Sequence, residues 1–272
     1  MSSNDTLSIT GKEANLKALL SDYGALAVAY SGGVDSAYLS DVAHDTLGTN
    51  ARILLADSPS VPRSEVSEAS DLAHSRGWNF EIIHTDEFEN ESYLSNDGTR
   101  CYHCRSELFS KMSAYAEKTG VTIMAYGEIV DDLADTTRLG AKAAKEYRVV
   151  APLVEVGLSK AEIRELSVLR GLPTHDKPSF ACLSSRFPVG TRVTVDDLKK
   201  VEAAEEALKH HGFRQYRARH HGDTCRIEID PQDIPKLIDE DIRQGVVRDV
   251  TAAGYKFVTL DLSGYRTGST AE

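Results

Sequence analysis

The sequence predicts an α/β fold, in which a doubly wound parallel sheet is followed by a small α+β lobe. Short apolar runs alternate with helical patterns as far as Gly171, which is typical of parallel strands joined by helices. The first run ends in a Ser-Gly-Gly turn, and the composition changes after Pro188-Val-Gly190. Because 272 residues are enough for two domains, we expect one domain over 1–192 and a second over 193–272.

The expected strands of the first domain are short apolar or alternating runs bounded by glycine, proline or polar residues. They are residues 25–30, 52–56, 79–84, 121–126 and 148–153. The expected helices carry apolar side chains three and four residues apart. They are residues 12–23, 35–47, 65–75, 101–118, 139–147 and 159–171, the last opened by the capping box Ser159-Lys-Ala-Glu162. The acidic segment 85–100 is expected to be a loop.

The second domain is expected to begin with an amphipathic helix over 194–211, which opens with a Thr-x-x-Asp start. Two strand-like runs, 214–220 and 224–229, flank His221-Gly-Asp223, so we expect a hairpin there. Residues 233–240 read as helical and 255–260 as a last strand. The order helix, hairpin, helix and strand predicts a small α+β lobe.

Composition favours a cytoplasmic protein that does not bind membranes. The net charge is −11, and an acidic chain is a poor general ligand for nucleic-acid phosphates. No apolar run is as long as a transmembrane helix, and the first 22 residues contain no signal-peptide core. Four cysteines in a chain of this length are not a secreted disulfide framework. We expect reduced thiols, some of them bound to metal or redox-active.

The stretch Ala25-Leu-Ala-Val-Ala-Tyr-Ser-Gly-Gly-Val-Asp-Ser36 predicts an anion-binding loop. A strand, a glycine turn and a helix start together present backbone N–H groups to an anion, with the positive end of the helix behind them. Gly32 and Gly33 let phosphate oxygens approach the backbone, and Ser31 and Ser36 add hydroxyl donors. The string is neither a Walker loop nor a Gly-x-Gly-x-x-Gly motif. An ordinary serine-glycine turn is the alternative.

Several polar residues are expected at the same edge of the sheet, because ligands of doubly wound folds bind beyond the carboxyl ends of the strands. Asp57 and Gly127 each follow an expected strand, and the loop 178–187 could reach the same edge. Asp35 would repel phosphate directly, so it reads either as a helix cap or as a ligand of the Mg²⁺ that accompanies a triphosphate.

Three cysteines form the second strong feature of the sequence. Cys101 and Cys104 make a C-x-x-C pair, which alone could be half a zinc site, a redox pair or a chance pairing. With Cys182 they would supply the three thiolates of a [4Fe–4S] cluster with one open iron. A buried core thiol is the alternative for Cys182, and Cys225 reads as a packed strand thiol. The pairs His210-His211 and His220-His221 read as surface residues.

Four stretches together resemble the LarE family of ATP-dependent sulfur transferases. Ser31-Gly-Gly-Val-Asp-Ser36 is similar to the pyrophosphate loop (PP-loop) of ATP pyrophosphatases. The others are Arg100-Cys-Tyr-His-Cys104, Leu172-Pro-Thr-His-Asp-Lys-Pro-Ser-Phe-Ala-Cys-Leu-Ser-Ser-Arg186 and Asp261-Leu-Ser-Gly-Tyr-Arg-Thr-Gly-Ser269. The segment that begins Gly127-Glu-Ile-Val-Asp-Asp departs from the Gly-Thr-Asn-x-Asp-Asp pattern of the family.

The resemblance implies that 1–192 is a PP-loop domain of the adenine nucleotide alpha hydrolase type, and that 193–272 binds substrate or forms a homo-oligomer. The family adenylates a carboxylate of pyridinium-3,5-biscarboxylic acid mononucleotide and inserts sulfur to give a thiocarboxylate, in biosynthesis of the nickel-pincer nucleotide. Some members sacrifice the sulfur of one cysteine, whose position here is Cys182. Others use three cysteines and a cluster, and the extra pair Cys101 and Cys104 favours that type. Sulfide or another donor would then supply the sulfur.

The adenylation chemistry that the resemblance implies suggests roles for the candidate site residues. The nucleotide contacts would come from Ser31, Gly32, Gly33, Val34, Asp35, Ser36, Asp57 and Gly127. Asp35 and Asp132 are the first candidates for Mg²⁺, with Asp131 and Asp135 as further ones; a solvated helix face is the alternative for the last three. The anionic acceptor would contact Ser185, Arg186, Arg217, Arg219 and Glu228.

Spacing supports the arginine pair, because Arg217 and Arg219 stand two apart on an expected strand and face the same way. Glu228 on the neighbouring strand could orient one of them. An exposed basic strand face is the alternative.

Two other functions stay open from the sequence, namely tRNA thiolation by a related PP-loop enzyme and a nucleotide-binding sensor of redox state or metal without turnover.

Overall fold

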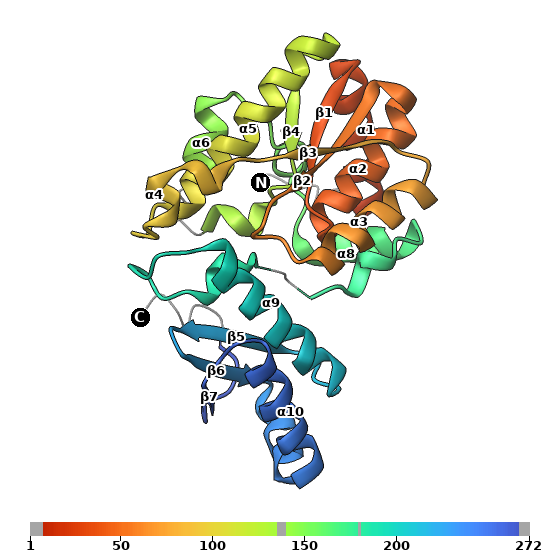
Figure 1. Cartoon of the computed structure of the whole chain (residues 1–272). Coiled ribbons are helices and arrows are strands. Elements are labelled where there is room, and N and C mark those ends of the chain that lie inside the picture. Colours follow the sequence, from red (N-terminus) through yellow and green to blue (C-terminus); the bar gives the residue numbers. More distant parts are fainter. Residues whose placement is uncertain (1–7, 135–139, 179–180, 267–272) are drawn as a thin grey trace. The chain divides into compact units, whose positions relative to one another are not determined.

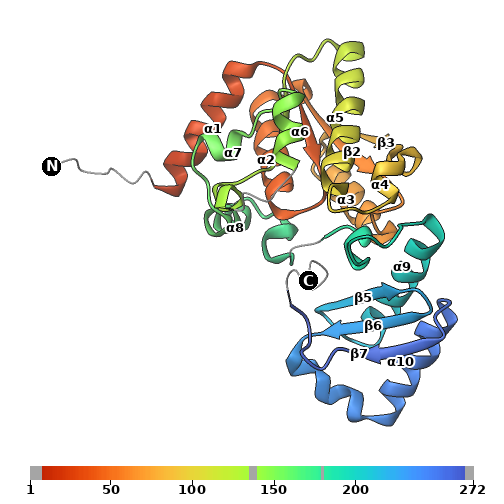
Figure 2. The same cartoon turned by 90° about the vertical axis from the view of Figure 1, so that its left-hand side faces the viewer.

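The computed structural model describes residues 8–134, 140–178 and 181–266, which form two compact units (Figures 1 and 2). The first unit contains the described chain up to Ser58, then Arg63–Glu87, and the described residues from Cys101 as far as Pro178. The second contains Pro59–Pro62, Phe88–Arg100 and the chain from Ala181 onward. Two short segments of the second unit therefore come from the amino-terminal part of the chain, most of which forms the first unit.

A four-stranded parallel sheet forms the centre of the first unit, in the order β3-β2-β1-β4. Its strands are β1 (Leu26–Tyr30), β2 (Ala51–Asp57), β3 (Asn79–His84) and β4 (Met124–Tyr126). The predicted parallel α/β sheet is confirmed. The order reverses at β1, which pairs with β2 on one side and β4 on the other. A reversal of this kind opens a crevice for ligands at the carboxyl ends of the strands.

Side chains of β1 alternate between two apolar cores because successive residues of a strand point to opposite faces. Leu26, Val28 and Tyr30 pack in one core, and Ala27 and Ala29 belong to the other. The first core includes α1 (Ile9–Tyr23), α2 (Val34–Leu47), α3 (Arg63–Ser75) and α8 (Lys160–Leu169). The second includes α5 (Arg100–Thr119) and α6 (Gly140–Glu146) (Figure 1). Helices thus cover both faces of the sheet.

Two expected elements of the first domain are wrong in detail. Only a single bridge between Ala125 and Val150 forms where a fifth strand was expected, because Pro152 opens the short helix α7 (Pro152–Glu155). The segment expected to be a loop contains η2 (Glu87–Glu89) and α4 (Glu91–Leu94), the latter capped by Asn90. The remaining short turns are η1 (Gly48–Asn50), η3 (Val130–Ala134), η4 (Pro173–Asp176) and η5 (Leu183–Arg186).

The buried carboxylate of Asp41 in α2 binds two arginines, Arg76 directly after α3 and Arg170 directly after α8. Asp41 of α2 is 4% exposed and accepts hydrogen bonds from Arg76, at 2.8 and 3.0 Å, and from Arg170 Nε at 2.6 Å. Arg170 Nη1 also donates to Glu13 of α1 at 2.7 Å. Burial alone would raise the pKa of Asp41, but the hydrogen bonds from the two arginines outweigh it and lower the pKa.

The second unit packs two helices against a three-stranded mixed sheet, β5-β6-β7. Besides α4 and η5, this unit contains α9 (Val195–His210), β5 (Tyr216–His221), β6 (Thr224–Ile229), η6 (Pro231–Ile238), α10 (Glu240–Ala252) and β7 (Phe257–Leu260). The hairpin is confirmed, with the two-residue turn Gly222-Asp223 between antiparallel strands. The segment expected to be helical over 233–240 is largely the 3₁₀ helix η6, and the longer helix α10, which was not expected, begins at Glu240.

His220 is buried, so the expectation that it lies at the surface is wrong. It is 4% exposed, stacks on Phe187 with ring centroids 4.7 Å apart, and its Nδ1 lies 3.1 Å from the hydroxyl of Tyr255. Its Nε2 lies 4.0 Å from Asp197. Burial lowers the pKa of His220, and the nearby Asp197 only partly opposes this. The imidazole is therefore neutral in the folded unit near pH 7.

We expect acid to destabilise the second unit through His220. Its unfolded form binds a proton near pH 6.5, above the lowered pKa of the folded form, so the free energy of unfolding falls as pH drops below about 6.5. The loss is about 1.4 kcal/mol for each unit by which folding lowers the pKa. Urea unfolding at pH 7.5 and 5.5 measures it. His220→Phe should reduce this pH dependence and His210→Phe, an exposed control, should not; equal slopes in all three proteins would contradict the assignment.

Candidate functional site

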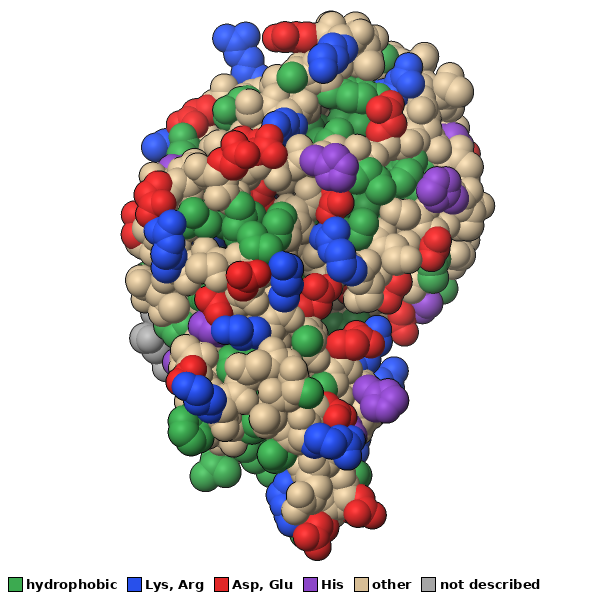
Figure 3. All heavy atoms as spheres, in the orientation of Figure 1, with side chains coloured by type: hydrophobic (Ala, Val, Ile, Leu, Met, Phe, Trp, Pro, Cys, Tyr) green, Lys and Arg blue, Asp and Glu red, His purple; other side chains and the backbone are tan. Residues whose placement is uncertain are grey.

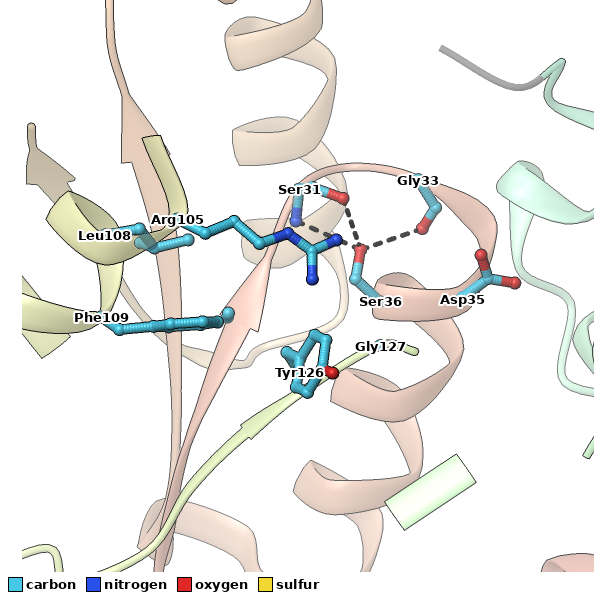
Figure 4. A pocket seen from close by; sticks show the side chains of 10 residues that line it. Ser31, Gly33, Asp35, Ser36, Arg105, Leu108, Phe109, Tyr126 and Gly127 are labelled. Atoms are coloured by element: carbon cyan, nitrogen blue, oxygen red, sulfur yellow. Dashed lines mark hydrogen bonds between the residues drawn. The ribbon is translucent and has the colours of Figure 1, made fainter. Parts of the chain in front are cut away.

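A pocket of about 200 Å³ lies where β1 passes into α2, at the carboxyl edge of the sheet (Figure 4). Its lining residues are Ala29, Ser31, Gly33, Asp35, Ser36, Arg105, Leu108, Phe109, Tyr126 and Gly127. Five of the eight predicted nucleotide-binding residues therefore line one pocket. The other three, Gly32, Val34 and Asp57, are not among its lining residues.

Hydrogen bonds fix the turn between β1 and α2. The Ser36 hydroxyl accepts from the Ser31 amide at 3.1 Å and donates to the Gly33 carbonyl at 3.2 Å. The two serine hydroxyls lie 3.0 Å apart. Gly32 has a φ of +74°, which favours glycine, and a Cβ there would lie 3.0 Å from the Cβ of Ala69.

The first amides of α2 are available to an anion. Gly33 is the N-cap residue, and in the described part of the chain no side chain caps the helix. An uncapped helix start has free N–H groups and a partial positive charge, which suit phosphate oxygens. The geometry of this turn therefore agrees with the anion loop that the sequence predicts.

Lys160 reaches this loop from α8. Its ammonium lies 2.6 Å from Oδ2 of Asp35, and its backbone amide donates to Asp131 at 2.9 Å. The other carboxylate oxygen of Asp35, Oδ1, is buried and has no hydrogen-bond partner within the described structure. Burial raises the pKa of Asp35, although Lys160 opposes the change. A buried oxygen without a donor is suited to coordinate a cation.

The wall opposite the loop is partly aromatic. Figure 4 shows the Arg105 guanidinium extending from α5 toward the loop, with Tyr126 below it. The guanidinium carbon lies 5.2 Å from the centre of the Tyr126 ring, and the hydroxyl of Tyr126 donates to Glu128. An arginine held over an aromatic ring keeps its charge directed at the pocket, where it could bind a phosphate.

The other predicted acidic residues have different environments. Asp57 forms ion pairs with Arg63 at 2.6 Å and His84 at 3.5 Å. Asp131 accepts the hydrogen bond from the start of α8, and Asp132 acts electrostatically on Asp35, whose pKa it raises. Asp135, the last of the predicted acidic candidates, lies outside the described residues.

The predicted cysteines lie on both units. Cys101 and Cys104 lie near the start of α5, three residues apart and so on one helix face, with Cys101 exposed and Cys104 partly exposed. Cys182 belongs to the second unit and is also partly exposed. Within the described ranges, no group of three or more His, Cys, Asp or Glu side chains is gathered as for a metal ion. The first unit alone therefore supplies two of the three thiolates that the sequence predicts for an iron–sulfur cluster. Cys225 is fully buried, as expected, and burial raises its pKa to about 12.

A buried ion pair holds the turn that carries Cys182. Arg186 is 1% exposed and donates to both carboxylate oxygens of Glu205, at 2.8 and 2.9 Å. Its Nη1 donates to the carbonyls of Ala181 at 2.6 Å and Cys182 at 3.1 Å, and to the hydroxyl of Ser185 at 2.8 Å. The guanidinium thereby fixes the backbone on which the thiol is mounted.

The start of the cysteine-pair motif contacts the same turn. Arg100, the residue directly before Cys101, donates to the carbonyl of Ser184 at 2.8 Å. The hydroxyl of Ser184 lies 2.8 Å from that of Tyr93. These contacts, all inside the second unit, connect the segment before Cys101 to the segment after Cys182.

The predicted arginine pair lies on β5 beside this turn. Arg217 and Arg219 are 9% and 4% exposed, so an exposed basic strand face is excluded. Arg219 donates to Glu228, which is fully buried, at 2.8 Å, and to the Ser185 carbonyl at 3.0 Å. The guanidinium carbon of Arg217 lies 4.9 Å from the centre of the Tyr265 ring. The pKa of Arg217 is lowered, mainly by burial and in addition by repulsion from Arg186. Closely packed arginines of this kind suit a ligand with phosphate and carboxylate groups.

Comparison with known proteins gives full-length relatives, although no family model matches the chain. The uncharacterized protein slr1717 of Synechocystis sp. is 40% identical over 261 residues, which cover 96% of this chain and 97% of the relative. The pyridinium-3,5-bisthiocarboxylic acid mononucleotide synthase of Lactiplantibacillus plantarum is 33% identical over 258 residues, covering 94% and 92%. The chain belongs to the LarE family. The uncharacterized protein MJ0830 of Methanocaldococcus jannaschii is 27% identical over 240 residues, covering 88% and 90%.

Membership of the LarE family confirms the resemblance read from the four motifs. Lys160, Arg105 and Glu205 are the polar residues at these sites that the sequence analysis missed. A signal was present for Lys160, because a lysine in the first turn of a helix opposes the helix dipole and so calls for a local anion. Arg105 directly follows the cysteine pair. Glu205 lies on an amphipathic helix, where one more acidic residue does not indicate a site.

One face of this LarE-family chain is mixed in charge. On the face shown in Figure 3, Lys and Arg side chains are interspersed with Asp and Glu. Among the helices that the structure describes, none combines the length and apolar character of a membrane-spanning segment.

Proposed function

We propose that this chain is an ATP-dependent sulfur transferase that converts a carboxylate of pyridinium-3,5-biscarboxylic acid mononucleotide to a thiocarboxylate, as a step in nickel-pincer nucleotide synthesis. The full-length similarity to the Lactiplantibacillus synthase carries this proposal. The pocket at the turn between β1 and α2 supports it, because adenylation needs a site for a triphosphate.

In the first step a carboxylate oxygen of the acceptor attacks the α-phosphorus of ATP. The bond to the bridging oxygen breaks, and pyrophosphate leaves with the electron pair. The amides of Gly33 and the first turn of α2 would hold the departing pyrophosphate, with Ser31 and Ser36 as hydroxyl donors. Gly32, Val34, Asp57 and Gly127 are the further proposed nucleotide contacts. Arg105 would neutralise phosphate charge from the opposite wall.

Asp35 is the proposed ligand for Mg²⁺, with Asp132 as the second candidate. Oδ1 of Asp35, which is buried and has no hydrogen-bond partner among the described residues, fits a cation, and Lys160 holds the other oxygen. Bound Mg²⁺ would neutralise phosphate charge and orient the triphosphate.

We expect Lys160→Met to raise the KM for ATP by about tenfold, which corresponds to roughly 1.4 kcal/mol of lost binding. The ammonium forms an ion pair with Asp35, and its loss leaves the loop more negative. Initial rates at varied ATP and saturating acceptor measure the effect. Lys199→Met, which removes an exposed lysine from α9, is the control. An unchanged KM for Lys160→Met would remove this residue from the nucleotide site.

The acceptor would bind in the second unit. Arg217 and Arg219, together with Ser185, Arg186 and Glu228, form a buried polar group whose arginines suit phosphate and carboxylate. Glu228 and Glu205 hold two of these arginines in fixed orientations, which reduces the entropy lost on binding.

In the second step sulfur replaces AMP. A sulfur nucleophile attacks the carbonyl carbon of the acyl-adenylate, the new C–S bond forms, and the C–O bond to AMP breaks. If hydrosulfide attacks, a proton is released and the thiocarboxylate forms directly. If the Cys182 thiolate attacks, a thioester forms; loss of the Cα proton and cleavage of the Cβ–S bond then leave dehydroalanine and the thiocarboxylate.

The three-cysteine motif favours the first version of this step, with a [4Fe–4S] cluster held by Cys101, Cys104 and Cys182. Held by these three thiolates, such a cluster would supply the sulfide-level sulfur for the attack. Cys101 and Cys104 are correctly spaced on one helix face for two of the ligands.

The deciding experiment uses protein purified without oxygen. Iron and labile sulfide are assayed first, and ATP, Mg²⁺, acceptor and sulfide are then supplied. We expect pyrophosphate and AMP to be released in equal amounts, with thiocarboxylate formed over many turnovers. A single turnover with conversion of Cys182 to dehydroalanine would instead support the sacrificial version. Absence of acceptor-dependent pyrophosphate would refute the proposal and leave a nucleotide-binding sensor, whereas tight, salt-dependent tRNA binding would support tRNA thiolation.

A further inference from the structure

Arg105 carries a positive charge beside the anion loop. It lines the pocket, and Figure 4 shows its guanidinium extending toward Ser31 and Ser36. Among the residues that the structure describes, no carboxylate forms an ion pair with it. A long arginine side chain has many rotamers, and fixing one of them costs entropy. The neighbours of Arg105 therefore decide whether its charge stays directed at the loop.

Tyr126 of β4 supports the guanidinium. The centre of its ring lies 5.2 Å from the guanidinium carbon, within the range of a cation–π attraction. The ring is itself held in place, because it packs edge-on against Phe109 with centroids 5.8 Å apart and its hydroxyl donates to Glu128. Burial, and then the hydrogen bond to Glu128, raise the pKa of Tyr126. The hydroxyl therefore keeps its proton and remains a donor.

Glu128 strengthens the support that Tyr126 gives. A carboxylate that accepts a hydrogen bond from a phenol makes the aromatic ring richer in electrons, and such a ring attracts a cation more strongly. The two side chains come from the carboxyl end of β4, which pairs with β1 next to the anion loop. Glu128 thus acts on Arg105 through the Tyr126 ring.

Gly140, the first residue of α6, leaves the space that the Arg105 side chain occupies. A Cβ at this position would lie 2.6 Å from Cδ and 2.7 Å from Nε of Arg105, which is too close for two non-bonded atoms. Because the crowded atoms belong to a flexible side chain, the arginine would move and the helix backbone would stay. A methyl group on residue 140 would therefore displace the guanidinium without removing its charge.

We propose that Tyr126 and Glu128 are positioning residues that hold Arg105 against the β- and γ-phosphates of the nucleotide. The inference rests on the proposed function, in which the loop receives these two phosphates as pyrophosphate. An arginine directed at the loop should favour ligands that carry a pyrophosphate group over AMP, which lacks one. All the residues involved belong to the first unit.

Equilibrium dialysis of the full chain against ATP, pyrophosphate and AMP, each with Mg²⁺, tests the inference. Gly140→Ala should weaken binding of ATP and pyrophosphate about tenfold, and that of AMP by no more than about threefold, because Arg105 is displaced from the loop. Tyr126→Leu should show the same selective loss. Tyr126→Phe and Glu128→Gln keep the aromatic ring and should weaken ATP only about threefold.

Gly245→Ala is the matched control. Gly245 is also a helical glycine beside a flexible side chain, since an added Cβ would lie 2.5 Å from Cε1 of His211, but both residues belong to the second unit. All three affinities should be unchanged in this variant. Urea unfolding of each variant separates a change in binding from a change in stability.

A double-mutant cycle shows whether Tyr126 acts through Arg105. Arg105→Met should weaken ATP at least about tenfold, and adding Tyr126→Leu should weaken it less than about twofold further. Additive losses, or a ratio of ATP to AMP affinity that Gly140→Ala leaves unchanged, would overturn the inference. Failure of the unmodified chain to bind ATP would instead refute the proposed function.

Discussion

Replacing Gly127 with alanine is expected to reduce the proposed ATP-dependent activity at least about 100-fold, because the new methyl group has no space beside the anion loop. A Cβ on Gly127 would lie 2.8 Å from the amide nitrogen of Ser36 and 3.0 Å from its Cα. Both contacts are with backbone, so no side-chain rotation can relieve them. The first turn of α2 must move, and the proposed phosphate-binding amides move with it.

Acceptor-dependent pyrophosphate release by Gly127→Ala measures this effect. Gly24→Ala is the control, since Gly24 has a φ of +69° and nothing within 4 Å of an added Cβ. Its strain should cost about 1 kcal/mol of stability and leave the rate unchanged. Activity of Gly127→Ala within threefold of the unmodified chain would mean that the loop adapts and that its position is not critical.

Removal of the Asp41 carboxylate should cost about 3 kcal/mol of unfolding free energy. Asp41→Ala leaves Arg76 and Arg170 without the buried partner that both bind, and an uncompensated charge in such a site is strongly destabilising. Alanine is the better helix former, which offsets roughly 0.5 kcal/mol of the loss. Asp45→Ala removes a 52% exposed carboxylate from the same Arg170 and should cost less than about 1 kcal/mol.

Urea unfolding at pH 7 and pH 3 tests this assignment. Because folding lowers the pKa of Asp41, its contribution is complete above an unfolded pKa of about 3.9 and disappears as pH falls through the lower folded value. The difference in free energy of unfolding between Asp41→Asn and the unmodified chain should therefore be smaller at pH 3 than at pH 7. A constant difference would indicate that packing, rather than charge, accounts for the loss.

Local patterns were sufficient to predict most elements of the fold. The run ending at Tyr30, the capping box at Ser159 and the hairpin turn at Gly222 each depend on neighbours in sequence, and all three are confirmed. The expected fifth strand was wrong for a reason that the sequence contained, since Pro152 favours a helix start.

The candidate site could be predicted only where its residues form one motif. Ser31, Gly33 and Ser36 were found together because a strand, a turn and a helix are contiguous. Lys160 enters the same site from a helix about 125 positions later, and its role depends on tertiary packing that no local pattern expresses. Burial of Arg217 and His220 was missed for the same reason, since polar side chains are usually exposed unless distant partners stabilise them.

One lysine near the amino end of the described chain connects α1 to the helix of Lys160. Lys12 donates to the Gly157 carbonyl at 2.6 Å and to Glu162 at 2.7 and 2.9 Å, and Glu162 completes the capping box with Ser159. Versions of the protein trimmed past Lys12 would lose this brace. For protein engineering, fusion tags belong ahead of Ile9, and a trimmed protein that folds yet loses the proposed ATP binding should be examined first at this contact.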